Sequence, residues 1–464
     1  MEATAATVDR PVDRIEDVVN GIFSPLGSLP YKQVLPKVQS DVALSLNKNA
    51  EELTEDELKG IISRYLRDHH IKCDLTSSAS VLTNYIYHDM AGLSFISREN
   101  LFDQDGFEEL DINSWDDVEI ILRGKRQKTD YQFLSPEHAN DILLRMFRQT
   151  VTPFDLAFPG ATADIGNGIR VTALRAPLVD EDAAISVSIR KVDMTTVARE
   201  RLVQTTLTEQ MMTFLELCLT HGVSIAFSGE TGAGKTSLAG CLLGYAAKTL
   251  RIYTIEEGSR EWDFVQRNED GKITNSVIHT RTRPNEKDLS QNFGQEELVK
   301  LALRFNPDVI APGEIRGREA FEVMGVSNTG HTVMTTVHSN GTLDTPERII
   351  TLAKKAYDMT DTTLFSMCAR AFPLLVHMEK NADLQRRVTE IREVTGCVHG
   401  EVQSQLLFKF DIEDNLYEGD VCVETVGAFR QLKPISQELA KRMLKKGARR
   451  SELQQFLEVE HDPA

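Results

Sequence analysis

One glycine-rich segment constrains the fold of this chain more than any other: Gly229-Glu-Thr-Gly-Ala-Gly-Lys-Thr236. It matches the pattern Gly-x4-Gly-Lys-[Ser/Thr] in full, with the apolar run Val223–Phe227 before it and a helical segment from Ser237 after it. In such a strand–loop–helix context, glycines let main-chain N–H groups converge on phosphates, and the helix N-terminus adds its positive dipole. The segment therefore predicts a phosphate-binding loop (P-loop); an ordinary glycine-rich turn is the alternative.

The P-loop predicts ATP and Mg²⁺ as cofactors. Lys235 should reach the β- and γ-phosphates, and the Thr236 hydroxyl should bind Mg²⁺. We expect the rest of the loop to contact the nucleotide through Gly229, Thr231, Gly232, Ala233, Gly234 and Ser237.

Charge and composition narrow the possible partners. The formal net charge is −18, which counts against direct nucleic-acid binding because that binding needs concentrated cations. Cations do gather near the C-terminus, as a solvated helix face or as a docking patch for acidic lipid or protein: Lys433, Lys441, Arg442, Lys445, Lys446, Arg449 and Arg450.

The compartment is predicted from three negative observations. No apolar stretch is long enough to span a bilayer, and the first residues lack the pattern of a signal peptide. The six cysteines are scattered without a Cys-x-x-Cys pair, so neither a zinc site nor a disulfide framework is indicated. We expect a cytoplasmic protein.

The pattern of apolar residues divides the chain. Before about residue 195, helix and strand signals mix: Thr54 and Glu57 have capping-box spacing, Ser135 precedes a helix that starts at Pro136, and apolar and polar residues alternate over 185–190. After residue 210, apolar runs alternate with helical segments, which is typical of a mostly parallel sheet. We predict an α/β protein with an N-terminal extension (1–53), an α+β domain (54–195), a linker (196–210), a nucleotide-binding domain (211–430) and a helical tail (431–464).

Acidic residues follow two of the predicted buried strands. Glu314 ends the run from Asn306, and Glu256, Glu257 and Glu261 follow the run Ile252–Ile255. At the carboxyl edge of a parallel sheet, Glu314 would face the γ-phosphate, where it could hold Mg²⁺ or orient the attacking water. A further apolar run, 332–337, lies between His331 and His338. Each histidine is a candidate contact to nucleotide or to a neighbouring subunit; a core or surface histidine is the alternative.

These four segments resemble the P-loop, acidic box, second Walker element and histidine box of the type II/IV secretion ATPases. The resemblance covers about residues 100–410 and is greatest with the Flp/Tad-pilus and conjugation-channel branch, through Ile185-Ser-Val-Ser-Ile-Arg190-Lys, Ala369-Arg-Ala and Arg387-Val-Thr-Glu390-Ile. It implies a PAS-like N-terminal α+β domain and a RecA-like ATPase domain. The family's acidic box usually reads Glu-Asp-x-x-Glu, whereas Glu257-Gly-Ser-Arg-Glu261 is one residue longer. Glu261 is our preferred match to the catalytic glutamate, with Glu256 and Glu257 left open.

The predicted site combines the P-loop with residues outside it. Lys235, Glu261, Glu314 and His338 are the predicted catalytic residues, and Thr236 and Glu314 are the predicted metal ligands. Arg170 and Arg190 match basic residues that clamp nucleotide phosphates, and such an arginine can accelerate phosphoryl transfer about 10³–10⁵-fold. Surface or ion-pair roles are the alternatives for Arg190 and Arg316. The remaining predicted nucleotide contacts are Glu257, Arg316 and His331.

The resulting hypothesis is an ATP hydrolase that acts as a cytoplasmic hexameric motor for protein secretion, Flp or type IV-like pilus assembly or conjugative transfer. We expect a homo-hexamer on the inner face of the cell membrane, bound to an inner-membrane platform protein. ATP would lie between two domains that move about the linker during turnover. A nucleic-acid motor, such as a helicase or packaging ATPase, is the main alternative. A small-molecule kinase is a second one.

Overall fold

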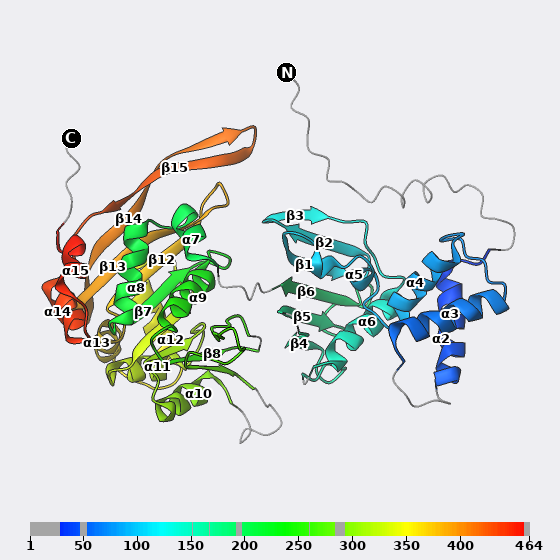
Figure 1. The fold of residues 1–464 in the computed structure, drawn as a ribbon, viewed down its shortest axis with the longest axis horizontal. Helices are drawn as coiled ribbons and strands as arrows, with labels where there is room; N and C mark the ends of the chain where they lie inside the picture. Colours follow the sequence, from blue (N-terminus) through cyan, green and yellow to red (C-terminus); the bar gives the residue numbers. More distant parts are fainter. Residues whose placement is uncertain are drawn as a thin grey trace. The chain divides into compact units, whose positions relative to one another are not determined.

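The computed structural model of the chain describes residues 28–46, 53–150, 152–166, 168–191, 197–258, 260–283 and 293–458. These residues form two compact units, which divide between residues 192 and 193 (Figure 1). The weak helical pattern over 15–23 lies outside the described residues.

Helices open the first unit. They are α2 (Tyr31–Leu46), α3 (Glu55–Asp68) and α4 (Ala79–Met90). The predicted capping box is present, because Thr54 accepts the Glu57 N–H while the Glu57 carboxylate accepts the Thr54 N–H. Val34 and Val38 of α2 are fully buried against α3 and α4. This part of the predicted N-terminal extension therefore packs into the first unit.

An antiparallel sheet forms the rest of the first unit. Its strand order is β3-β2-β1-β6-β5-β4. As predicted, α6 begins at Pro136 with Ser135 as its N-cap, and its apolar face packs on the sheet. The elements are α5 (Phe95–Arg98), η1 (Leu101–Asp103), β1 (Phe107–Ser114), β2 (Asp117–Leu122), β3 (Lys125–Lys128), α6 (Pro136–Arg148), β4 (Gly160–Asp164), β5 (Ile169–Arg175) and β6 (Ile185–Lys191).

The second unit is built on a nine-stranded sheet, in the order β15-β14-β13-β12-β7-β11-β10-β8-β9. The strands from β12 to β9 in this order are parallel, and β13, β14 and β15 add to one edge in antiparallel register. The predicted mostly parallel sheet is confirmed. Its strands are β7 (Ile225–Gly229), β8 (Ile252–Glu256), β9 (Val277–Arg281), β10 (Val309–Pro312), β11 (Thr332–Val337), β12 (Leu374–Lys380), β13 (Arg386–Val398), β14 (Glu401–Glu418) and β15 (Val421–Gln431).

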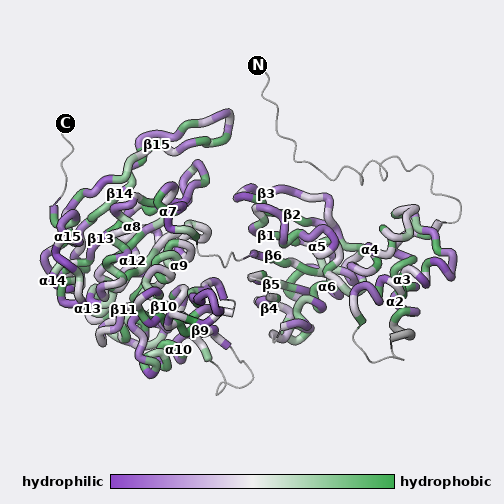
Figure 2. The backbone as a smooth tube through the Cα atoms, viewed as in Figure 1, coloured by the Kyte–Doolittle hydropathy of each residue, from purple (hydrophilic) through white to green (hydrophobic). Residues whose placement is uncertain are grey.

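Helices cover both faces of this sheet and complete two apolar cores. One core joins the sheet to α8, α9, α14 and α15, and the other joins it to α10–α13. Figure 2 shows the apolar central strands of this unit. The helices are α7 (Arg199–Thr205), α8 (Glu209–Thr220), α9 (Lys235–Ala246), α10 (Gln295–Ala302), η3 (Leu303–Phe305), α11 (Ala320–Asn328), α12 (Thr345–Ala353), α13 (Asp361–Ala371), α14 (Gln437–Lys445) and α15 (Arg450–Leu457).

Two segments differ from the predicted domain plan. The predicted linker contains α7, whose Leu202 is buried in the second unit. The predicted tail contributes Met443 and Phe456, both fully buried, to the same core. The second unit therefore includes its C-terminal helices. None of the described helices combines the length and the apolarity that crossing a bilayer requires.

Candidate functional site

The P-loop joins the carboxyl end of β7 to the first turn of α9. Gly232 and Gly234 adopt φ values of 80° and 92°, which only glycine adopts readily. A Cβ atom on Gly229 would lie 2.2 Å from the carbonyl oxygen of Met378. The loop therefore needs glycine for its turn and for its close approach to β12.

The lysine of the P-loop lies inside the loop rather than in solvent. Lys235 is 6% exposed, and its Nζ donates to the carbonyl oxygens of Gly229 and Glu230 at 2.8 and 2.7 Å. Burial lowers the pKa of this amine, while the charge of Glu314 opposes the shift. Lys235 is thus held beside a carboxylate from another strand.

The next part of the site lies around Glu314. It follows β10, the second neighbour of β7 in the sheet. Its Oε2 accepts a hydrogen bond from Arg316 at 2.8 Å, and Nε2 of His338, at the end of β11, lies 3.0 Å from Oε1. Burial and the Lys235 charge lower the pKa of His338, whereas Glu314 opposes this. The carboxyl edge of the sheet therefore brings Lys235, Glu314, Arg316 and His338 together.

The acidic box has one buried and two more accessible glutamates. Glu256 is 4% exposed, and its Oε2 accepts the N–H groups of Glu261 and Trp262 at 2.5 and 3.0 Å. Glu257 reaches across to Arg316, with Oε2 at 3.3 Å from a guanidinium nitrogen. Glu261 is half-buried and contributes to the electrostatic field at Arg316. The backbone N–H groups thus hold Glu256, whereas Glu257 and Glu261 lie nearer the surface.

Trp262 fastens this acidic segment to the P-loop helix. Its Nε1–H donates to the carbonyl oxygen of Thr236 at 3.2 Å, and its indole lies against Gly240 of α9, where a Cβ would approach to 3.0 Å. Nothing in the sequence pattern indicated this contact. The acidic box and the predicted Mg²⁺ ligand Thr236 are therefore fixed relative to each other.

Two further residues at the P-loop were missed by sequence reasoning. Arg386, at the start of β13, donates from Nε to the carbonyl oxygen of Gly232 at 2.8 Å. Beneath the loop, the Oγ of Ser228 lies 2.9 Å from Nδ1 of His377, which is 4% exposed. Both pairings join residues about 150 positions apart in the chain, and only the β7–β12–β13 arrangement brings them together.

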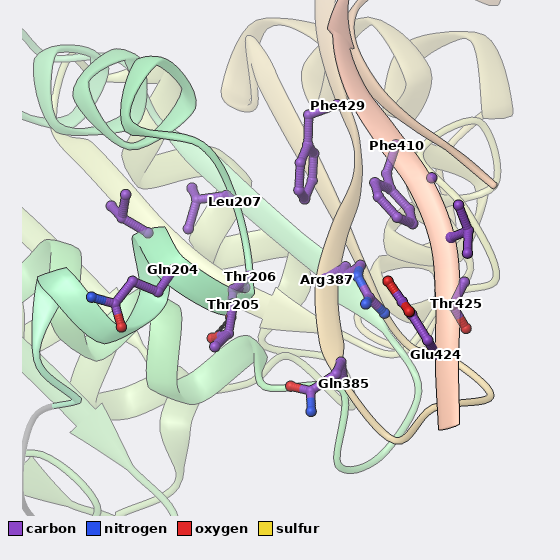
Figure 3. Close-up of a pocket in the computed structure, with 13 residues that line it drawn as sticks. Gln204, Thr205, Thr206, Leu207, Gln385, Arg387, Phe410, Glu424, Thr425 and Phe429 are labelled. Carbon is purple, nitrogen blue, oxygen red and sulfur yellow. Dashed lines mark hydrogen bonds between the residues drawn. The ribbon is translucent and has the colours of Figure 1, made fainter. Parts of the chain in front are cut away.

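One cavity of the second unit opens on the P-loop, and another lies beside α7. A cleft of about 630 Å³ is bounded by P-loop residues Gly229–Thr231 and by His338, Asn340 and Arg348. A second cavity, of about 400 Å³, lies between α7 and the β14–β15 hairpin (Figure 3). The first cavity opens directly on the P-loop.

The wall of the second cavity contains an ion pair that fixes the hairpin. Arg387 pairs with Asp383 at 2.7 Å and lies over the ring of Phe410, with 5.1 Å between guanidinium carbon and ring centroid (Figure 3). The Arg387 guanidinium lowers the pKa of Asp383 to about 2. Asp383 also accepts the N–H of Thr425 at 3.1 Å. The turn between β12 and β13 thus supports β15.

The two arginines predicted to clamp phosphates lie in the first unit. Arg170 and Arg190 face each other across β5 and β6, flanked in register by Asp164 and Glu109. Ile189 beside Arg190 is fully buried while Arg190 is exposed, so Arg190 does leave the core. Like charges directly opposite destabilise a sheet, and the flanking carboxylates compensate for this.

Within the second unit, the predicted site residue His331 lies away from the P-loop edge. It precedes β11, whereas His338 follows it, so the strand separates them by roughly 20 Å at 3.3 Å per residue. Oγ1 of Thr329 lies 3.4 Å from its Nδ1. The proposed role of His331, at nucleotide or at a neighbouring subunit, stays a prediction.

Comparison with known proteins gives matches over the second unit and beyond. A family model described as "Type II/IV secretion system protein" matches residues 165–452. A Mycobacterium tuberculosis protein, provisionally named a conjugal transfer protein, is 29% identical over 194 residues, 42% of this chain and 52% of that protein. The conjugal transfer protein TrbB of Rhizobium radiobacter is 26% identical over 203 residues, 43% of this chain and 57% of TrbB. The chain thus spans about half the length of these relatives. Among solved structures, the Legionella pneumophila ATPase DotB matches with a TM-score of 0.46 and 19% identity, over 65% of this chain and 80% of DotB.

Proposed function

Because the chain belongs to the type II/IV secretion system protein family, whose model matches residues 165–452, we propose that it hydrolyses ATP to drive protein secretion, Flp or type IV-like pilus assembly, or conjugative transfer. One observation carries the proposal. Lys235 lies within electrostatic reach of Glu314, and Glu314 contacts both Arg316 and His338. A lysine, a carboxylate and an arginine that converge on a phosphate-binding loop are the components of phosphoryl transfer to water.

The residues fit a nucleotide with Mg²⁺. Oε1 of Glu314 is buried and accepts no hydrogen bond from the described residues, since His338 is near but not aligned with it. A buried oxygen without a donor suits the water shell of a cation. Thr236 and Glu314 are the proposed Mg²⁺ ligands, and bound Mg²⁺ would neutralise charge on the phosphates. Among the described residues, no cluster of three or more His, Cys, Asp or Glu forms a separate metal site.

Each side chain then has a proposed role in catalysis. Lys235 binds the β- and γ-phosphates, and the P-loop amides surround them. Glu261 accepts a proton from the attacking water, while Glu257 keeps Arg316 directed toward the site through the contact described above. Burial and the Lys235 charge lower the pKa of His338, which favours a neutral imidazole that donates a hydrogen bond without adding charge.

At the level of the whole protein, we propose a homo-hexamer in the cytoplasm, associated with the inner face of the cell membrane through a platform protein. Arg170 and Arg190 contribute cations to the nucleotide. Their direct apposition across β5 and β6 supports this role, because it places two cations next to each other on one sheet.

Phosphate release from ATP by purified protein tests the proposal. Lys235→Ala should abolish release, and Glu314→Gln should slow it while a fluorescent ATP analogue still binds. Lys248→Ala is the matched control, because Lys248 follows the same helix and only lies over the ring of Tyr245. Arg190→Ala should reduce turnover without changing the melting temperature.

Three outcomes would contradict these assignments. Normal turnover by Lys235→Ala would show that hydrolysis does not depend on the P-loop lysine. Transfer of phosphate to an acceptor other than water would indicate a kinase. Stimulation of turnover by single-stranded DNA would favour a nucleic-acid motor.

A further inference from the structure

The β14–β15 hairpin extends beyond the rest of its sheet (Figure 1). The turn between β12 and β13 supports it as far as Thr425, which is 3% exposed. Residues 416–424, the hairpin tip, lie beyond this support and are exposed with the exception of half-buried Cys422. Folded proteins usually shorten or cover the exposed edges of their sheets, because such an edge can pair with another chain.

The hairpin tip is both apolar and acidic. Leu416, Tyr417, Val421 and Val423 are 44–64% exposed, and Figure 2 shows hydrophobic and hydrophilic stretches along the hairpin. Residues 411–424 contain six carboxylates and no lysine or arginine. The hairpin's salt bridges among the described residues, Lys409–Asp411 and Arg430–Glu413, lie toward its base. Glu418 and Asp420 therefore remain available to a cationic partner, whereas Glu424 lines the second cavity beside Arg387 (Figure 3).

The same chain carries a surface of complementary character. This basic surface consists of Lys433, Lys441, Lys445, Lys446, Arg449 and Arg450, all exposed, with Leu432 and Leu444 at 42% and 41% exposure. Glu438 is the single carboxylate within residues 433–450. No salt bridge within the described part of the chain uses these cations. Leu444 and Lys441 are three residues apart on α14, so they are neighbours on the helix surface.

The hairpin tip does not reach the basic surface of its own chain. β15 runs for 11 residues from the tip toward α14, which places the two roughly 35 Å apart at 3.3 Å per residue. In Figure 1, the tip points away from α14. Pairing with β14 along this whole length prevents the strand from folding back.

We propose that the hairpin tip of one copy docks on the basic surface of a second copy. Acidic side chains then face cations, and the exposed valines, leucine and tyrosine of the tip meet Leu432 and Leu444. The two surfaces are different patches of the same chain, so the contact is head-to-tail and propagates from copy to copy, closing a ring when the rotation permits. The inference rests on the proposed self-assembly but not on ATP hydrolysis.

Sedimentation velocity of the full chain with ATP and Mg²⁺ tests the contact. A tip-reversed variant carries Glu418→Lys and Asp420→Lys, and a surface-reversed variant carries Lys441→Glu, Lys445→Glu and Lys446→Glu. Each should raise the half-assembly concentration about tenfold at low salt, because opposed charges become like charges. Both sets in one chain should restore assembly to within about threefold of wild type. Raising NaCl from about 50 to about 500 mM should weaken the wild-type contact.

Two control variants keep the test decisive. Glu269→Lys with Asp270→Lys makes a similar charge change at another exposed site of the second unit and should leave assembly unchanged. Glu418→Gln with Asp420→Asn removes charge without reversing it, and should give a smaller shift even if the reversed variants fold poorly.

The proposal is overturned if tip and surface variants assemble as wild type does, or if combining them restores nothing. A surface-reversed chain that loses binding to phosphatidylserine vesicles yet assembles normally would identify the basic surface as a lipid contact instead. If every variant still formed hexamers as wild type does, this contact would be refuted but the proposed hexamer would not. A wild-type chain that stays monomeric, with and without ATP, would refute the proposed ring as well.

Discussion

Replacing Glu256 distinguishes a positioning carboxylate from a catalytic one. Its Oε2 accepts the N–H groups of Glu261 and Trp262, so Glu256→Ala should release the segment that carries both. Glu256→Gln keeps an acceptor oxygen and should hold the segment nearly in place. Glu261→Gln removes the proposed proton acceptor without disturbing these bonds.

The expected sizes follow from the burial and the bonds of Glu256. Hydrogen bonds to a buried charged group contribute about 1.5–3 kcal/mol each, so Glu256→Ala should cost about 3–5 kcal/mol in unfolding free energy and Glu256→Gln about 1–2 kcal/mol. Turnover of Glu256→Gln should stay within about tenfold of wild type. Glu261→Gln should lose about 10²–10⁴-fold, the usual contribution of a general base.

The chain offers a direct spectroscopic probe of this segment. It contains two tryptophans, so Trp115→Phe leaves Trp262, 5% exposed, as the only one. In that background, Glu256→Ala should shift Trp262 emission to longer wavelength, while Glu256→Gln should not. Guanidinium unfolding followed at Trp262 gives the stability change, and steady-state phosphate release gives kcat. If Glu256→Gln abolished turnover while leaving emission and stability at wild-type values, Glu256 itself would be catalytic and the positioning role would be refuted.

Three further predictions concern the P-loop and its surroundings. Gly229→Ala should destabilise the second unit by about 2–4 kcal/mol, because the new Cβ meets the Met378 carbonyl oxygen at 2.2 Å. Gly325→Ala is the control, because a Cβ there has no atom within 4 Å. Equal melting temperatures for the two variants would contradict the clash. Arg386→Ala should raise KM for ATP about three- to tenfold without changing stability, since it removes one hydrogen bond to the loop, whereas Gln385→Ala should leave KM unchanged. Stability should fall as pH drops below about 6.5. Burial lowers the pKa of four histidines in the folded chain, so the unfolded chain takes up protons first: His88, His138, His338 and His377. Thermal unfolding between pH 7.5 and 5.5 measures this, and a melting temperature that rises toward pH 5.5 would contradict it.

The sequence predicted the parts of the fold that depend on local pattern. The strands β7, β8, β10 and β11 are buried on both faces, so their apolar runs identified them. The P-loop was predictable because its glycines and lysine satisfy a geometric demand within eight residues. Thr54 and Ser135 marked helix starts for the same reason: a cap is a contact between residues three apart.

What depends on distant contacts was not predictable. Glu256, Glu257 and Glu261 look alike in sequence, and only the folded turn commits the first of them to backbone N–H groups. Arg386 reaches Gly232 across 154 positions. The far halves of β14 and β15 carry acidic and apolar residues without clean alternation, because bulges interrupt their pairing near Asp414 and Tyr417, so the pattern for a strand was absent.

The adjacent residues Arg386 and Arg387 connect the P-loop to the β14–β15 hairpin within the second unit. One guanidinium touches the P-loop carbonyl of Gly232, and the other holds Asp383, to which the hairpin strand is bonded through Thr425. Neighbouring residues of a strand point to opposite sides, so any tilt at the start of β13 displaces both contacts at once. If the hairpin tip docks on a second copy as proposed, we expect a load on the far end of the hairpin to be transmitted to the P-loop, and by reciprocity nucleotide binding to change that contact.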